Sequence, residues 1–213
     1  DWRKGSIVTD VGSVKACIAE AARALVPYGV RYVGSHPMAG TEYSGPEAAL
    51  ATLYDQAETF ICPTDLADEA AVAEVEAFWQ SIGTRTRRIG IFEHDELVAH
   101  TSHISHLLAS ALTATVLECD TPEELDGRYS GCATGFRDTS RIASSSPAMW
   151  REIIEHNVPA VLDAARRFET RFHRLIEIIE AGDFDRFEAE FARGKELRDG
   201  WINYKKQMKS KSS

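Results

Sequence analysis

The stretch Ser35-His36-Pro37-Met38-Ala39-Gly40-Thr41-Glu42 decides how this chain is interpreted. Residues 30–34, directly before it, are mainly apolar and predict a short buried strand. His36 would then lie at the end of that strand, where α/β proteins commonly place their ligands. Pro37 fixes its own φ angle and disfavours helical geometry at His36. The stretch therefore predicts either a functional histidine at a strand end or a turn in which His36 makes only local hydrogen bonds.

Strand and helix signals alternate in the first part of the chain. Short apolar runs predict strands at residues 5–11, 30–34, 57–62 and 84–89. Amphipathic spacing predicts helices between them, at residues 14–26 and 67–82. This alternation is typical of a parallel sheet covered by helices.

The sequence after about residue 90 shows helical periodicity and no evident strand signal. The predicted helices cover residues 92–118, 137–144, 147–155, 159–181 and 184–208, with a glycine-rich loop at 127–135. Their apolar faces are wider than one chain can cover, which favours a homodimer. We therefore predict a partial Rossmann-like nucleotide-binding domain at residues 1–90 and an all-helical substrate and dimerisation domain at residues 91–213.

A dinucleotide-binding sheet usually opens with a strand, a GxGxxG turn and a helix. No GxGxxG sequence occurs in these 213 residues. We therefore expect the chain to hold the later part of such a sheet without its glycine-rich first half. On that expectation, the chain alone would bind a dinucleotide poorly.

Composition excludes several classes of protein. The net charge of -9 at pH 7 argues against a nucleic-acid-binding surface, which needs a basic face. No apolar run approaches the length of a membrane span, so we predict no membrane partner. The cysteines are far apart and form no CxxC pair; they are Cys17, Cys62, Cys119 and Cys132. They predict reduced, mostly buried thiols in a cytoplasmic protein.

Ser13 follows the first predicted strand, as His36 follows the second. Neighbouring parallel strands end side by side, so Ser13 is predicted to reach the His36 ring. No GxSxG sequence surrounds Ser13, which disfavours acyl transfer by this pair. The remaining role is a histidine general base that is oriented by a hydroxyl group.

Residues 126–151 are locally basic within an acidic protein: Arg128, Arg137, Arg141 and Arg151 are accompanied by Asp126 and Asp138. Arginine side chains bind carboxylates through two parallel hydrogen bonds, so the segment suggests an anionic substrate. The alternative is that these arginines pair with neighbouring carboxylates on a solvated helix face.

Three histidines, His100, His103 and His106, share one arc of the predicted helix at 92–118. Three imidazoles on one face can bind zinc. No carboxylate or cysteine accompanies them on that face, so we predict helix packing with one substrate-facing histidine and no metal.

The motifs of the chain, taken together and in order, resemble those of the prephenate/arogenate dehydrogenase family of tyrosine biosynthesis. They are Asp10-x-Gly12-Ser13-Val14-Lys15, His36-Pro37-Met38-Ala39-Gly40-Thr41-Glu42-x-x-Gly45, Ser102-His103-x-x-His106, Gly135-Phe136-Arg137-Asp138-x-x-Arg141-Ile142-Ala143 and Pro147-x-Met149-Trp150. Each motif is weak alone, but the set covers the chain from about residue 5 to 155.

The resemblance implies oxidative decarboxylation of prephenate to 4-hydroxyphenylpyruvate, or of arogenate to tyrosine, with NAD or NADP as the cofactor. It implies that His36 is the catalytic base, which accepts the proton of the ring hydroxyl as hydride leaves that carbon. Ser13 would be the partner of His36 beside the nicotinamide, and Gly12 would also lie at the cofactor.

The same resemblance implies a site for a dicarboxylate substrate. Arg141 would anchor a carboxylate, and Asp138 would hold Arg141 in place. Trp150 would cap the pocket of the partner subunit in a homodimer. The other residues of the pocket would be Thr41, Glu42, His106 and Arg137.

Two other functions remain open from the sequence. A different NAD-dependent hydroxy-acid dehydrogenase would share the architecture, but it ordinarily uses a lysine base on a helix. A truncated, catalytically idle helical dimerisation module would form dimers and ignore 4-hydroxyphenylpyruvate. A metal-dependent hydrolase built on the histidine helix is a distant third.

Overall fold

The computed structural model describes residues 2–40, 45, 47 and 49–210. Its contacts divide the chain into two compact units, Asp1–Leu162 and Asp163–Ser213. The first unit contains the sheet and the helices that follow it, and the second contains most of the last two helices. None of the helices in the described residues is long and apolar enough to cross a membrane.

Within the described residues, four strands form one sheet in the order β1-β2-β3-β4: β1 (Ile7–Thr9), β2 (Arg31–Pro37), β3 (Glu58–Cys62) and β4 (Arg85–Arg88). The pairs β1–β2 and β3–β4 are parallel, as predicted, but β2 and β3 are antiparallel. Residues 49–56, which lead into β3, contain turns and no crossover helix. A parallel connection requires such a crossover, so β3 returns antiparallel and the sheet is mixed.

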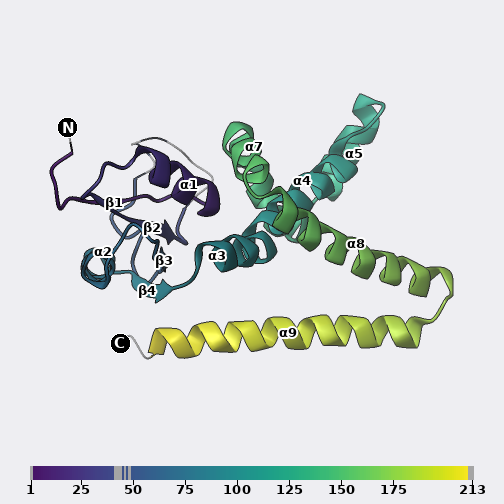
Figure 1. Cartoon of the computed structure of the whole chain (residues 1–213). Coiled ribbons are helices and arrows are strands. Elements are labelled where there is room, and N and C mark those ends of the chain that lie inside the picture. Colours follow the sequence, from purple (N-terminus) through teal and green to yellow (C-terminus); the bar gives the residue numbers. More distant parts are fainter. Residues whose placement is uncertain (1, 41–44, 46, 48, 211–213) are drawn as a thin grey trace. The chain divides into compact units, whose positions relative to one another are not determined.

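Helices α1 (Ala16–Leu25) and α2 (Glu69–Ser81) cover opposite faces of the sheet (Figure 1). Tyr32 packs against Ala19 of α1, whereas Val33 packs against Trp79 of α2. Successive residues of a strand point to opposite faces, so these two neighbours in β2 define the two layers of core. The predicted α/β architecture of this part is thus present.

The chain after β4 is helical throughout its described residues. Its first unit continues with α3 (Ile91–Val98), the π-helix η2 (Ala99–His103), α4 (Ile104–Leu117), α5 (Pro122–Gly131), α6 (Thr134–Ser140), the 3-10 helix η3 (Arg141–Ser144) and α7 (Pro147–Glu155). The single helix predicted at 92–118 is therefore interrupted by a π-turn. Such turns occur frequently at functional sites.

The predicted glycine-rich loop at 127–135 is wrong, because Gly127 and Gly131 lie in α5 and Gly135 lies in α6. Helix α5 begins with strong start signals. Thr121 accepts a hydrogen bond from the Glu124 N–H at 3.2 Å, and proline occupies the first helical turn. These signals outweigh a helix cost of about 1 kcal/mol for each glycine.

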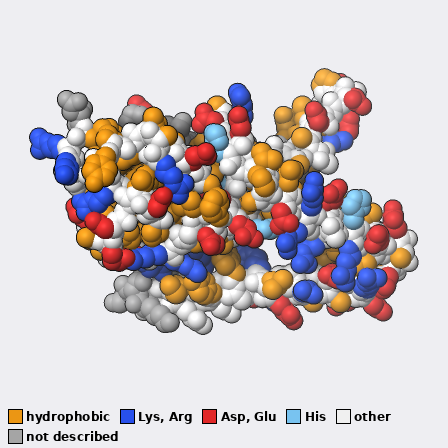
Figure 2. Space-filling view, viewed as in Figure 1, with side chains coloured by type: hydrophobic (Ala, Val, Ile, Leu, Met, Phe, Trp, Pro, Cys, Tyr) orange, Lys and Arg blue, Asp and Glu red, His pale blue; other side chains and the backbone are white. Residues whose placement is uncertain are grey.

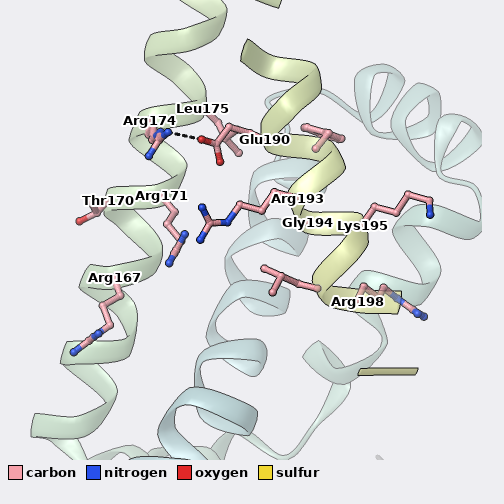
Figure 3. Close-up of a pocket in the computed structure, with 12 residues that line it drawn as sticks. Arg167, Thr170, Arg171, Arg174, Leu175, Glu190, Arg193, Gly194, Lys195 and Arg198 are labelled. Carbon is pink, nitrogen blue, oxygen red and sulfur yellow. Dashed lines mark ion pairs between the residues drawn. The ribbon is translucent and has the colours of Figure 1, made fainter. Parts of the chain in front are cut away.

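The second unit consists of α9 (Phe184–Ser210) and most of α8 (Val158–Glu180). The two helices enclose a groove of about 1080 Å³. Figure 3 shows Arg171 and Arg193 extending into this groove, beside the ion pair between Arg174 and Glu190 at 2.5 Å. Figure 2 shows Lys and Arg side chains gathered over this unit, with apolar side chains also at the surface.

All four cysteines are free. Only Cys62 is buried, so the prediction that the thiols are mostly buried is wrong. Burial raises the pKa of the Cys62 thiol to about 12, which keeps it protonated and unreactive at neutral pH.

Candidate active site

His36 lies inside β2, one residue from its end, and its side chain is almost completely buried. Its Nδ1 atom lies 2.9 Å from Nε2 of His94, in the first turns of α3. The other ring nitrogen of His94, Nδ1, lies 2.8 Å from Oδ1 of Asp95. Asp95, His94 and His36 therefore form one continuous chain of hydrogen bonds.

The electrostatic surroundings of His36 keep its imidazole neutral. Burial, followed by electrostatic interactions with His94, Lys15 and His103, lowers its pKa to about 3, against the charge of Asp95. A neutral imidazole is the form that can accept a proton. His36 is therefore in the protonation state that a general base needs at neutral pH.

A buried ion pair between Asp10 and Lys15 fixes the strand ends beside His36. The Lys15 ammonium also donates to the carbonyl oxygen of Ser35 at 2.8 Å. The other oxygen of Asp10 accepts hydrogen bonds from the Tyr32 hydroxyl at 2.9 Å and from the Ser35 N–H at 3.1 Å. This network holds the end of β1 against the residue that precedes His36.

Gly12 and Ser13 lie in the loop between β1 and α1. The Gly12 N–H donates to Asp10 at 2.9 Å, and a Cβ atom at Gly12 would lie only 2.5 Å from Cδ1 of Ile18. Ser13 is half-buried, and its hydroxyl makes no hydrogen bond with His36 in the described structure. The partner of the His36 ring is His94, so the predicted role of Ser13 stays a prediction.

The residues that follow β1 are compatible with a ligand at this edge of the sheet. Gly12 and Ser13 are small, and the neighbouring Val11 side chain is 61% exposed. They follow the carboxyl end of β1, beside the parallel strand β2, and this edge binds ligands in open α/β sheets.

A second group of predicted residues surrounds a cavity in the helical part of the first unit. His106 of α4 stacks on Trp150 of α7, with ring centroids 3.9 Å apart. Both line a cavity of about 500 Å³, next to residues 142 and 143 of η3. Burial lowers the pKa of His106, and the charge of Arg141 lowers it as well. Arg141 and His106 are thus close enough to interact electrostatically.

The histidine ring of this cavity has a defined orientation. Its Nδ1 atom lies 3.0 Å from the carbonyl oxygen of Ser102, which can only accept a hydrogen bond. Nδ1 of His106 is therefore protonated, and Nε2 is left as an acceptor. The ring nitrogen of Trp150 is buried and has no hydrogen-bond partner in the described structure.

The other predicted residues have different surroundings. Asp138 forms an ion pair with Arg137 at 3.1 Å, and both side chains are largely exposed. Whether Asp138 also supports Arg141 stays a prediction. Thr41 and Glu42 lie outside the described residues.

The three histidines at 100, 103 and 106 do not share one environment. His103 is buried, and its Nδ1 atom lies 3.3 Å from the amide nitrogen of Asn157. Burial lowers the pKa of His103 to about 4, whereas His100 is exposed. Within the described residues, no group of three His, Cys, Asp or Glu side chains could hold a metal ion.

Sequence reasoning missed His94, Asp95 and Asn157. Asn157 donates to the carbonyl oxygen of Asp95 at 2.8 Å and joins it to His103. One local signal was available, since a histidine followed by a carboxylate opens the first helix after the last strand. The partner of His94 could not be found this way, because it lies 58 positions earlier in the chain.

Comparisons with known proteins agree with this architecture. The sequence model "Prephenate dehydrogenase, nucleotide-binding domain" matches residues 2–88, and "Prephenate dehydrogenase, dimerization domain" matches residues 92–193. A prephenate dehydrogenase of Bacillus subtilis is 32% identical over 91% of this chain and 52% of its own length. A cyclohexadienyl dehydrogenase of Zymomonas mobilis is 32% identical over 92% of this chain and 66% of its own length.

Solved structures give the same result. The prephenate dehydrogenase of Aquifex aeolicus, in complex with hydroxyphenyl propionate and NAD+, has a TM-score of 0.82 and 32% identity over 94% of this chain and 68% of that one. The Synechocystis arogenate dehydrogenase has a TM-score of 0.77 and is 26% identical over 92% of this chain and 69% of its own chain. The chain spans between about half and two thirds of the curated relatives it matches. With both domains and most of its length matched, the chain belongs to the prephenate dehydrogenase family.

Proposed function

We propose that this chain carries the catalytic base and the substrate pocket of an NAD-dependent enzyme that oxidatively decarboxylates prephenate or arogenate. One observation carries the proposal: a buried, neutral histidine at the ligand-binding edge of the sheet, His36. Membership of the prephenate dehydrogenase family favours this reaction over that of another hydroxy-acid dehydrogenase or an idle helical module. NADH formation with prephenate or arogenate in the full-length protein tests it, and activity with neither substrate would contradict it.

The reaction needs a base and a hydride acceptor. Gly12 and Ser13 would hold the nicotinamide end of NAD, which would supply the acceptor for the hydride of the ring carbon that carries the hydroxyl group. His36 accepts the proton of that hydroxyl, so a carbonyl forms there. The ring carboxylate then leaves as CO2, and its bonding electrons enter the ring, which becomes aromatic. Because aromatisation drives this loss, the remaining task of the protein is to position the substrate and exclude water.

We infer that the cavity beside His106 and Trp150 receives the far end of the substrate, with Arg141 on its carboxylate. Arg141 interacts electrostatically with His106, and residues 142 and 143, which directly follow Arg141, line the cavity together with His106. The guanidinium group offers two parallel donors to a carboxylate. Stacked aromatic rings supply an apolar wall for a six-membered ring.

Replacement of Arg141 by Gln removes this charge and leaves a shorter, neutral polar side chain. We expect KM for prephenate to rise by roughly 10- to 100-fold, the cost of one hydrogen bond to a charged group. Steady-state kinetics measure it, with Arg23→Gln as the control because Arg23 pairs with Asp65 on the exposed surface. An unchanged KM for Arg141→Gln would exclude the anchoring role.

We also infer a homodimer formed by the helical part, and a domain boundary near residue 90. The boundary is supported by the end of β4 at Arg88 and by the separate family matches at 2–88 and 92–193.

The dimer is supported by large apolar side chains that α8 and α9 leave exposed, among them Phe172, Phe191 and Trp201. Exposed apolar area of this kind marks an interaction surface.

Sedimentation equilibrium tests the dimer. We expect the mass of two chains for the wild type and of one chain for Phe172→Glu, because the new carboxylate would have to be buried without a partner. Glu169→Gln on the same helix is the control, and a monomeric wild type would contradict the inference.

The four free cysteines support a reducing compartment such as the cytoplasm. Thiol titration of protein purified without reductant would test this.

A further inference from the structure

We propose that His94 and Asp95 are positioning residues that set the tautomer of His36, so that the proton of its ring lies on Nδ1 and Nε2 is free to act as the base. This inference rests on the proposed function for its catalytic consequence. The arrangement of protons that it requires follows from the hydrogen bonds alone.

The relay begins at Asp95, whose side chain is 8% exposed. Its Oδ1 atom accepts from the backbone N–H of Lys15 at 2.7 Å, and Oδ2 accepts from the backbone N–H of Ala16 at 2.9 Å. A carboxylate can only accept hydrogen bonds, and these donors fix both of its oxygens. Nδ1 of His94, 2.8 Å from Oδ1, must therefore carry a proton.

His94 transmits this choice to His36. The neutral imidazole has one donor and one acceptor nitrogen, so protonation of Nδ1 makes Nε2 of His94 an acceptor. That acceptor faces Nδ1 of His36 at 2.9 Å, which must then be the donor. His94 is fully buried, and its ring packs edge-on against Phe60 with centroids 5.6 Å apart. It therefore has no access to water that would offer another partner.

Asp95 also fixes the relay in the fold. By accepting from Lys15 and Ala16 it caps the N-terminus of α1, directly after the loop that holds Ser13. Asn157, at the junction of α7 and α8, holds the backbone of Asp95 from the other side at 2.8 Å. The sheet (through His36 and His94), α1 and the junction of α7 and α8 thus meet at one residue, Asp95. This arrangement resembles the way a buried aspartate orients a catalytic histidine in serine proteases.

The tautomers can be measured without any substrate. Two-bond nitrogen–proton correlations in the histidine rings of the wild-type protein, with His36→Asn and His94→Gln to assign the signals, show which nitrogen of each ring is protonated. At neutral pH we expect the proton on Nδ1 in both His94 and His36. A proton on Nε2 of His36 would overturn the proposal, whatever the activity of the enzyme.

Two variants of His94 test the catalytic consequence. Gln places an acceptor oxygen close to the position of Nε2, whereas Leu has no acceptor. We expect His94→Leu to lower kcat by roughly 10²- to 10⁴-fold with little change in KM, since the base loses its correct tautomer. His94→Gln should lose less than about tenfold, the cost of an imperfect hydrogen bond. The same two changes at His156, which is exposed, are the controls.

The outcomes separate this inference from the proposed function. An inactive wild type contradicts the function, while the tautomer measurement still decides the relay. An active wild type whose kcat survives His94→Leu contradicts the relay and leaves the function intact. If His94→Leu does not fold, two other results decide. A proton on Nδ1 of His36 in the wild type, together with a loss of kcat of less than about tenfold in His94→Gln, supports the proposal. A proton on Nε2 of His36 in the wild type overturns it.

Discussion

Replacement of His36 by Asn is expected to lower kcat for NADH formation by roughly 10²- to 10⁴-fold, the range that a general base contributes. Asn offers an amide near the position of Nδ1, which can still meet His94, but it has no basic nitrogen in place of Nε2. The buried, uncharged character of the site is kept. The loss should therefore fall on kcat rather than on folding or cofactor affinity.

The measurement compares steady-state kinetics, NAD binding and thermal unfolding of the two full-length proteins. His156→Asn, an exposed histidine of the same chain, provides the matched control. A His36→Asn variant that keeps kcat within about tenfold of the wild type would show that another group accepts the proton, since loss of a general base costs at least roughly 10²-fold.

Replacement of Asp10 by Asn is expected to reduce the free energy of unfolding by about 3 kcal/mol, the lower range for breaking a buried ion pair. Lys15 is completely buried, and its ammonium has Asp10 and one carbonyl oxygen as partners. Without the carboxylate, a positive charge remains buried without compensation. When Lys15 is replaced instead, water can solvate part of the Asp10 carboxylate, because that side chain is 18% exposed.

A double-mutant cycle in urea measures this coupling. Lys15→Met alone should cost less than Asp10→Asn, and the double variant should be more stable than the sum of the two losses implies. Arg23→Gln, which breaks an exposed pair with Asp65, should change stability by less than about 1 kcal/mol. Additive losses at Asp10 and Lys15 would show that the two charges do not stabilise each other.

Local sequence signals were sufficient for most of the fold. Alternating strand and helix patterns predicted the four strands of the described residues, and helical periodicity predicted α7 with its observed bounds. Amphipathic spacing also predicted α1, α2, α8 and α9 to within a few residues. These features depend on neighbours in the chain, which is why periodicity and capping residues reveal them.

Features that depend on distant contacts were missed. The antiparallel return of β3 follows from the connection before it, which has no periodic signal of its own. The π-turn at Ala99–His103 was missed because apolar residues at helical spacing occur both before and after it in the sequence. Gly127 and Gly131 favour a loop locally, but Thr121 and Pro122 start a helix there in spite of both glycines.

The candidate site shows the same division. His36 could be selected because Pro37 and the preceding apolar run place it at a strand end. His94 and Asp95 could not be connected to it, because hydrogen bonds between residues so far apart leave no mark in one sequence. Ser13 was chosen as the partner from strand order alone, whereas the ring contact of His36 in the structure is His94.

The stoichiometry of NADH and CO2 tests the central claim most directly. Full-length protein supplied with NAD and prephenate, and in parallel with arogenate, is assayed for both products in the same reaction. Oxidative decarboxylation predicts one CO2 released for each NADH formed, and loss of both together in His36→Asn. NADH without CO2 would identify a plain alcohol oxidation, and absence of both with either substrate would contradict the proposed reaction.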